Sequence, residues 1–110
     1  MRLILILAFL SLVLPVGCAV RRGEPISKPL TIGSPELARG EQAYKFYCDK
    51  CHPGGEQGLG PALTNKPLPG FLIKTQVRAG VGAMPAFSKR LLTDEQLDRV
   101  VAYLETLRRQ

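Results

Sequence analysis

Residues 47–60, "YCDKCHPGGEQGLG", bring together most of the reactive side chains of this 110-residue chain. Cys48 and Cys51 are three positions apart, and His52, the only histidine, follows directly. Four glycines then occur within seven residues. A cysteine pair followed by histidine can serve as a redox dithiol, bind a metal ion or attach a cofactor, so the rest of the sequence has to distinguish these uses.

Two of these uses fit the surrounding sequence poorly. A thioredoxin-type dithiol needs a strand before it and a helix after it, whereas a helical pattern precedes this pair and a glycine-rich loop follows. A closed zinc site needs four ligands, and the chain has no second cysteine pair and no other histidine. The third use is covalent haem attachment, for which C-x-x-C-H is the recognised signature. The pattern therefore predicts one haem c, with Cys48 and Cys51 bonded to the porphyrin and His52 on the iron.

A second axial ligand for the iron can come from a methionine. The chain has only Met1 and Met84, and Met1 belongs to the apolar N-terminal segment. Met84 lies in residues 79–87, "AGVGAMPAF", a loop free to place its thioether against the iron. Ligation by His52 and Met84 would raise the reduction potential relative to two nitrogen ligands, because a thioether favours ferrous iron.

The N-terminus indicates export. Residues 3–14, "LILILAFLSLVL", form a 12-residue apolar run after a single basic side chain. This is shorter than the roughly 20 residues of a membrane-spanning helix and is typical of a secretory signal. We expect a signal peptide over residues 1–17, a flexible tether rich in proline and glycine over 18–33, and one folded domain over 34–110.

The segment "PVGCAV" at residues 15–20 leaves three forms of this signal open. Gly17 before Cys18 resembles the lipobox of bacterial lipoproteins, in which the cysteine is lipidated, although Pro15 stands where leucine is usual. Cleavage after Ala19 also fits, and residues 3–20 could remain as an uncleaved anchor. The lipoprotein form predicts a domain held by Cys18 on the periplasmic side of a bacterial membrane.

The charge of the chain is moderately positive, at +6. In an exported protein this points away from nucleic acid and towards acidic protein partners or anionic lipid. Basic side chains around the haem edge would steer acidic partners at low salt. The candidates are Lys45, Lys50, Lys66, Lys74, Lys89 and Arg90.

A first helix is expected from Ser34, where a hydroxyl N-cap is followed by Pro35 and an acidic residue. Its buried stripe contains Gly40 and reaches the cysteine motif, which we place at the helix end. Glycine is unfavourable within a helix, so Gly40 predicts the close approach of another helix.

The last helix is marked by a capping box between Thr93 and Gln96. A shorter middle helix is expected over residues 69–79, ended by Gly80 in the left-handed conformation. No stretch alternates as a strand would, so the sequence predicts an all-α domain. The loops over residues 53–67 and 80–92 are long for a small domain, so we expect them to pack around a bound group.

These motifs together resemble the class I c-type cytochromes. Residues 38–52, "ARGEQAYKFYCDKCH", are similar to the first helix and haem motif of that family, and residues 60–63, "GPAL", to the loop below the histidine ligand. Residues 77–87, "VRAGVGAMPAF", are similar to the methionine segment, and residues 92–107, "LTDEQLDRVVAYLETL", to the C-terminal helix. The resemblance covers nearly all of 34–110 and is closest to small bacterial monohaem cytochromes and the haem domains of cbb3-type oxidase subunits.

The resemblance implies the cytochrome c fold, in which the N- and C-terminal helices cross and long loops surround the haem. The crossing would be built from Gly40, Tyr44 and Tyr103. Pro61 would offer its carbonyl to the ring N–H of His52, and Arg78 would either reach a haem propionate or remain solvated.

With both axial positions filled, the function implied is single-electron transfer between protein partners outside the cytoplasm, without enzymatic activity. Three alternatives remain at this point: a haem subunit of a larger dehydrogenase or oxidase complex, a peroxidase and a gas sensor. The last two need an open iron position, which Met84 would close.

Overall fold

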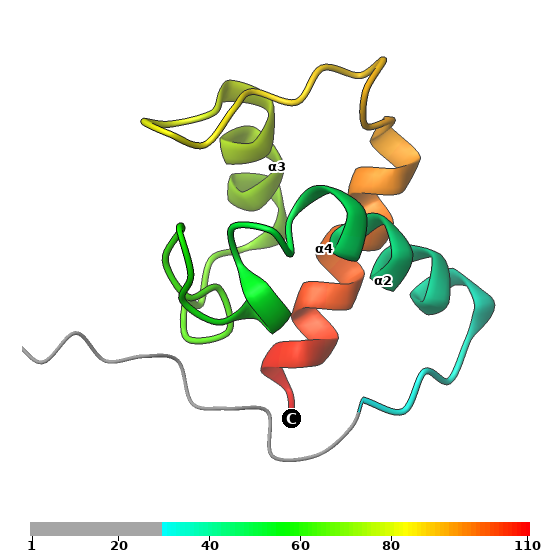
Figure 1. Cartoon of the computed structure of the whole chain (residues 1–110). Helices are drawn as coiled ribbons and strands as arrows, with labels where there is room; N and C mark the ends of the chain where they lie inside the picture. The colour runs from blue at the N-terminus through cyan, green and yellow to red at the C-terminus, as the bar shows by residue number, and fades with distance from the viewer. Residues whose placement is uncertain (1–29) are drawn as a thin grey trace, which may run out of the picture.

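The computed structural model describes residues 30–110, so the expected signal peptide, Cys18 and most of the tether lie outside the described residues. The described part forms α2 (Pro35–Tyr47), a 3-10 turn η1 (Pro53–Gly55), α3 (Gly70–Ala79) and α4 (Asp94–Arg108). Helix α2 crosses α4, and α3 also packs against α4 (Figure 1). Residues 30–110 contain no β-strand, only an isolated bridge between Val81 and Met84. The predicted all-α fold is confirmed.

Helix α2 begins as its sequence predicts. The Ser34 side chain accepts a hydrogen bond from the N–H of Leu37 at 3.2 Å, and Pro35 occupies the first turn. The end of the helix differs from the expectation, because α2 stops at Tyr47 and Cys48 is its C-cap. Cys51 therefore lies in the following turn rather than on the helical stripe.

The crossing of α2 and α4 is built around Gly40. A Cβ atom at this position would collide with the carbonyl oxygen of Arg99 and lie 3.3 Å from the Cβ of Tyr103. Beside this contact the rings of Tyr44 and Tyr103 pack with their centroids 5.2 Å apart. The prediction of a helix crossing at Gly40, formed with these two tyrosines, is confirmed.

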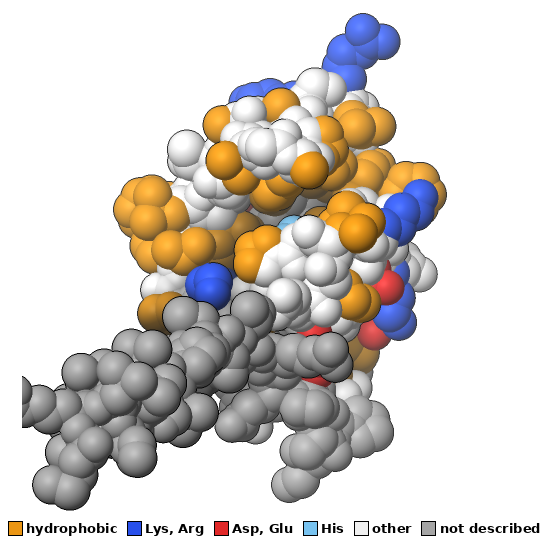
Figure 2. Space-filling model, turned by 60° about the vertical axis from the view of Figure 1, so that its left-hand side comes forward, with side chains coloured by type: hydrophobic (Ala, Val, Ile, Leu, Met, Phe, Trp, Pro, Cys, Tyr) orange, Lys and Arg blue, Asp and Glu red, His pale blue; other side chains and the backbone are white. Residues whose placement is uncertain are grey.

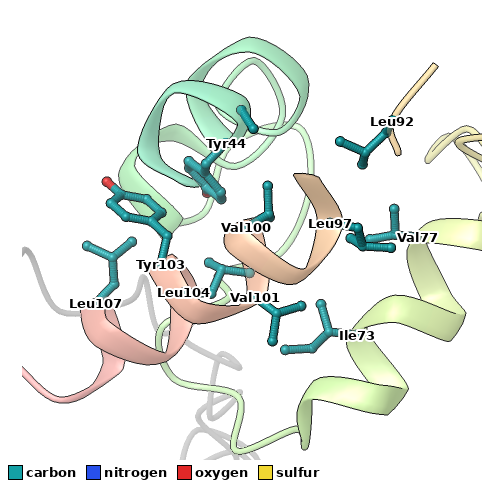
Figure 3. Close-up of a cluster of buried hydrophobic side chains, with 11 residues drawn as sticks. Tyr44, Ile73, Val77, Leu92, Leu97, Val100, Val101, Tyr103, Leu104 and Leu107 are labelled. Carbon is teal, nitrogen blue, oxygen red and sulfur yellow. The ribbon is translucent and has the colours of Figure 1, made fainter. Parts of the chain in front are cut away.

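The hydrophobic core lies on both sides of α4 (Figure 3). Tyr44 packs against it from α2, and Ile73 and Val77 pack against it from α3. Because α4 presents apolar side chains to both neighbours, it holds the two other helices in place. Its buried residues are Leu97, Val100, Val101, Tyr103, Leu104 and Leu107.

Helix α4 starts with the predicted capping box. The Thr93 hydroxyl accepts from the N–H of Gln96 at 3.2 Å, and the Gln96 side chain accepts from the N–H of Thr93 at 3.0 Å. The middle helix α3 has Pro69 as its N-cap and so begins one residue later than expected. Gly80 ends it with φ 69° and ψ 169°, which is a positive φ but not the left-handed helical conformation predicted for it. The extended ψ turns the chain into the loop that carries Met84.

Within residues 30–110, no helix has both the length and the apolar character that crossing a membrane requires.

Candidate haem site

The two cysteines of the C-x-x-C-H motif lie on a single turn of backbone. The N–H groups of Cys51 and His52 both donate to the carbonyl oxygen of Cys48, at 3.1 and 2.9 Å. Both thiols are half-buried, and neither is in a disulfide. The turn thus presents two thiols and an imidazole within five residues.

The His52 ring has a defined orientation and, in its neutral form, a defined tautomer. The residue is 7% exposed, and its Nδ1 lies 2.8 Å from the carbonyl oxygen of Pro61. A carbonyl oxygen only accepts hydrogen bonds, so in the neutral ring Nδ1 carries the proton and Nε2 keeps its lone pair. A lone pair on Nε2 is what a metal ligand requires, and the Pro61 contact is of the kind that orients ligand histidines.

Gly60 brings the chain against the face of the same ring. A Cβ at position 60 would overlap the imidazole, with Nδ1 and Nε2 both 2.8 Å away. The N–H of Gly60 donates to the carbonyl of Cys51 at 2.8 Å, which closes the loop over the motif. Only glycine fits here, because any side chain would displace the ring of His52.

The backbone of His52 is held by a contact that sequence reasoning missed. The buried hydroxyl of Tyr44 donates to the carbonyl oxygen of His52 at 2.5 Å. Burial raises the pKa of Tyr44 well above its usual range, and the nearby Cys48 adds to this effect. Tyr44 therefore remains a hydrogen-bond donor at physiological pH. The sequence gives no sign of this contact beyond the position of Tyr44 on the buried stripe.

The other glycines of the opening stretch approach the chain itself. A Cβ on Gly55 would lie 2.8 Å from the Thr64 side chain, and a Cβ on Gly58 would lie 2.6 Å from the ring of Pro53. Gly54 and Gly55 have φ of 60° and 82°, a conformation that favours glycine. These glycines let the loop fold tightly back on itself.

The Cys48 side chain lies where a charged thiolate is disfavoured. Burial raises the pKa of the Cys48 thiol to about 12, and the carboxylate of Asp49 and the neighbouring Cys51 add to the shift.

Met84 lies on a loop of defined backbone structure. The N–H of Met84 donates to the carbonyl of Val81 at 2.8 Å, and the N–H of Val81 donates back to Met84 at 3.0 Å. The loop returns to α3 through a hydrogen bond from the N–H of Phe87 to the carbonyl of Val77 at 2.9 Å. Met84 is half-buried and packs against the hydrophobic core. Its loop runs from α3 to α4 along the top of the view in Figure 1.

Arg78 is held by neighbouring groups of the chain. Its guanidinium donates to the carbonyls of Phe87 and Leu92, at 2.9 and 2.7 Å, and to the carboxylate of Asp94 at 2.7 Å. The side chain is 23% exposed, so the alternative of a solvated arginine is wrong. These contacts form because α3 ends beside the start of α4, where the carbonyls face the guanidinium. A contact between Arg78 and a haem propionate stays a prediction.

A second arginine binds the other long loop in the same way. Arg108, in the last turn of α4, donates to the carbonyl oxygens of Leu63 and Leu68, at 3.1 and 2.9 Å. We call Arg78 and Arg108 the two loop-binding arginines. Sequence reasoning missed this role for both, because backbone carbonyl acceptors leave no residue signature.

Three of the six basic side chains proposed to surround the haem edge are in ion pairs. Lys45 pairs with Glu41 at 2.9 Å, Lys89 pairs with Asp94 at 2.7 Å, and Lys74 pairs with Asp98. Their charges are partly neutralised by these carboxylates. Among residues 30–110, the other three have no carboxylate within ion-pair distance; these are Lys50, Lys66 and Arg90.

Exposed hydrophobic side chains occur on both loops and on α3. Figure 2 shows such side chains covering much of one face of the molecule, with Lys and Arg towards its edges. Leu59 is 90% exposed, Phe71 67% and Val81 64%, and Phe46 on α2 is 68% exposed. Exposed apolar side chains gathered on one face of a small domain indicate a surface that a ligand or partner covers.

These residues fit a covalently bound haem. Two unpaired thiols adjoin an imidazole whose Nε2 is available, and a methionine lies on a separate, ordered loop. The exposed apolar side chains suit a large apolar ring. A three-ligand metal site is not indicated, because residues 30–110 contain no cluster of three His, Cys, Asp or Glu side chains able to hold a metal ion.

Comparison with known proteins agrees with this site. The family model described as "Cytochrome C oxidase, cbb3-type, subunit III" matches residues 35–104. The cytochrome c subunit of 4-cresol dehydrogenase (hydroxylating) from Pseudomonas putida is 36% identical over 97 residues, covering 88% of this chain and 80% of that subunit.

Proteins named cytochrome c6 are similar over about two thirds of the chain. Cytochrome c6 from Bryopsis maxima is 42% identical over 79 residues, which are 63% of this chain and 89% of that protein. Cytochrome c6 from Cyanidioschyzon merolae is 38% identical over 77 residues, covering 63% of this chain and 72% of that protein. No solved structure matches the chain significantly. The matched family model and these relatives together show that the chain belongs to the cbb3-type subunit III family of class I c-type cytochromes, and that it is a haem electron-transfer protein with one covalently attached haem c.

Proposed function

We propose that this protein carries single electrons between protein partners on the periplasmic side of a bacterial membrane, in a respiratory chain, with His52 and Met84 as the axial ligands of its haem iron. A lipid on Cys18 would keep the domain near the membrane. The haem supplies the redox change when it is bound. The chain attaches it through Cys48 and Cys51 and fixes the ligand side chains.

One observation carries this proposal: the Nδ1 of the buried His52 ring lies 2.8 Å from the Pro61 carbonyl, directly beside two thiols that are not in a disulfide. This contact selects the neutral tautomer in which Nε2 has the lone pair that an iron ligand requires. Gly60 and Tyr44 restrict its movement from two further directions. A ligand that does not move on a change of charge suits electron transfer, because little reorganisation accompanies each step.

Met84 distinguishes an electron carrier from a peroxidase or gas sensor, because both of these need an open iron position. The test is a spectroelectrochemical titration of the holoprotein and its Met84→Ala variant. We expect low-spin ferric wild type, with the long-wavelength absorption band of thioether ligation and no carbon monoxide binding by the ferrous form. The variant should lose the band, bind carbon monoxide and have a lower reduction potential.

Val81→Ala is the matched control, since Val81 lies in the same loop with its side chain exposed. It should keep the potential and the band of the wild type. If Met84→Ala left the potential unchanged, Met84 would not be the ligand and the carrier function would lose its basis.

A second candidate is a haem subunit of a larger dehydrogenase. The similarity to the cytochrome c subunit of 4-cresol dehydrogenase, which spans 88% of this chain, favours it. Size-exclusion chromatography of the protein from its native host, followed by the haem absorbance, separates the two. A free carrier elutes at the size of a single small domain, and a subunit elutes with a flavin- or quinone-containing partner.

A further inference from the structure

Arg78 contacts the part of the Met84 loop that follows Met84, at Phe87 and at Leu92. Its Nη1 donates to the carbonyl of Phe87, three residues after Met84, and to that of Leu92, at the start of α4's capping region. Its Nη2 pairs with Asp94 in the first turn of α4. A single side chain at the end of α3 thus joins α3, the loop and α4.

The loop has two other polar attachments to the helices besides the ion pair of Lys89 with Asp94. The hydrogen bond from Phe87 to Val77 ties it to α3, and the exposed hydroxyl of Tyr47 donates to the carbonyl of Leu91 at 2.7 Å. Apolar packing of Met84, Phe87 and Leu92 on the core adds to these. The bonds of Arg78 are stronger than these neutral ones, because a guanidinium donor is charged and this one is largely removed from solvent. Opening of the loop would break both carbonyl bonds of Arg78 together.

We propose that Arg78 is a positioning residue for Met84, which keeps the loop closed and so keeps the thioether on the iron. This inference rests on the proposed ligation by Met84. The closed and open loops form a two-state equilibrium, and any external ligand for the iron binds only the open state. The apparent association constant of such a ligand is therefore its association constant for the open state, multiplied by the fraction of molecules whose loop is open.

Arg108 provides a matched comparison. It also donates to two backbone carbonyls from a helix end, but these belong to Leu63 and Leu68, in the loop that holds no proposed axial ligand. Replacing either arginine by methionine keeps an unbranched side chain and removes two carbonyl hydrogen bonds. Arg78→Met also removes the ion pair with Asp94, whose carboxylate keeps its pair with Lys89. The two variants therefore share the loss of carbonyl bonds and differ chiefly in which loop is released.

The experiment is a titration of imidazole against the ferric holoproteins of wild type, Arg78→Met and Arg108→Met, followed by the loss of the thioether absorption band. Arg78→Met should bind imidazole about tenfold more tightly than wild type. This corresponds to a loss of ~1.4 kcal/mol from the free energy that favours the closed loop over the open one. Arg108→Met should remain within about threefold of wild type. Equal changes in the two variants, or no change in Arg78→Met, would overturn the positioning role.

Arg78→Lys covers the case in which Arg78→Met yields no folded holoprotein. Lysine keeps the charge but lacks the planar fork that binds two acceptors. We expect an intermediate imidazole affinity and faster hydrogen exchange at the amides of Met84 and Phe87, with unchanged exchange at Leu63. Wild-type exchange and affinity in Arg78→Lys would contradict the proposal.

The wild-type spectrum separates this inference from the proposed function. A ferric wild type without the thioether band overturns both, because Met84 is then not a ligand. A wild type that has the band, with indistinguishable arginine variants, overturns the role of Arg78 alone.

Discussion

His52 is held from three directions by groups that do not touch its iron-binding nitrogen. Pro61 accepts from Nδ1, Gly60 packs against the ring, and the Tyr44 hydroxyl binds the backbone carbonyl. These contacts come from the loop after the motif and from α2. The imidazole is thus oriented by the protein fold, and its position does not depend on solvent.

The Tyr44 hydroxyl should contribute measurably to stability. Tyr44→Phe removes a buried hydrogen bond to the His52 carbonyl, which keeps its second bond from the N–H of Gly55 at 3.0 Å, so the free energy of unfolding should fall by about 0.5–1.5 kcal/mol. Chemical denaturation of the holoprotein, followed by circular dichroism, measures this. Tyr47→Phe is the control, because its bond to Leu91 is exposed and water can replace it; it should cost less, about 0.5 kcal/mol or below. A larger loss in Tyr47→Phe would contradict this assignment.

The sequence narrows the candidate functional residues most where chemistry restricts the residue type. Thiols at this spacing before a histidine, and one methionine beyond the N-terminal segment, leave few choices for the site. The roles of Tyr44, Arg78 and Arg108 were not predictable, because all three bind backbone carbonyls. Such acceptors occur at every residue, and only the folded chain determines which of them faces a given donor.

At the scale of elements, the crossing of α2 and α4 was predictable from Gly40, because a glycine inside a buried helical stripe usually marks the close approach of another backbone. The end of α2 was not predictable. The periodic stripe continues to Cys51, yet the helix stops at Tyr47 because the backbone turns towards the loop that covers His52. Local periodicity does not report this tertiary constraint.

Gly40→Ala tests the crossing. The new Cβ would collide with the Arg99 carbonyl, so the helices must separate, and the free energy of unfolding should fall by about 1–3 kcal/mol or more. Thermal or chemical unfolding of the holoprotein measures it. Gly33→Ala is the control, because nothing lies within 4 Å of a Cβ there, and it should leave stability nearly unchanged. A stable Gly40→Ala variant would show that the crossing tolerates a wider spacing.

The same two helices are joined by an ion pair that should make stability depend on pH. The hydrogen bond from Arg99 holds the pKa of Glu36 below its ordinary value of 4.5. The folded state therefore favours the ionised form, so this contribution is present above pH 4.5 and is lost as pH falls through the lower, folded-state pKa. Lys89 and Arg78 likewise hold the pKa of Asp94 below its ordinary value of 3.8. Its contribution to stability is therefore present above pH 3.8 and is lost as the pH falls through its lower, folded-state pKa.

Glu36→Gln tests this dependence. The variant should be less stable than wild type near neutral pH, and the difference should shrink as the pH falls below the ordinary carboxyl range. Denaturation midpoints of both proteins across that range give the comparison, and added salt should reduce the difference, because Glu36 is exposed. A difference that is constant with pH would exclude the ion pair as its source.

At the scale of the whole molecule, the fold wraps two long loops around one site and leaves basic charge on its surface. The positive charge of the chain predicts acidic partners. The structure reduces the number of basic side chains that could attract them, because the charges of Lys45, Lys74 and Lys89 are partly neutralised by ion pairs. Lys50, within the haem motif itself, has no such partner in the described part of the chain. Which basic side chains form ion pairs could not be predicted from the sequence, because it depends on which carboxylates the fold places beside them.

Lys50→Ala should slow electron transfer to an acidic acceptor protein roughly twofold at low ionic strength and have no effect at high ionic strength, because salt screens the attraction. Stopped-flow kinetics at several salt concentrations measures this. Lys45→Ala is the control, and its effect should be smaller, since Glu41 already offsets its charge. Rates that do not vary with salt would count against steering by surface charge.

The two loop-binding arginines have a consequence for protein engineering. Each holds its loop through backbone carbonyls, at Leu63 and Leu68 or at Phe87 and Leu92, so these bonds do not depend on which side chains the loop residues carry. Exposed residues between the carbonyls, such as Lys66 and Arg90, can therefore be exchanged while the arginine contacts and the buried Leu92 are kept. The charge of each loop thus becomes a property that can be redesigned on an unchanged helical scaffold.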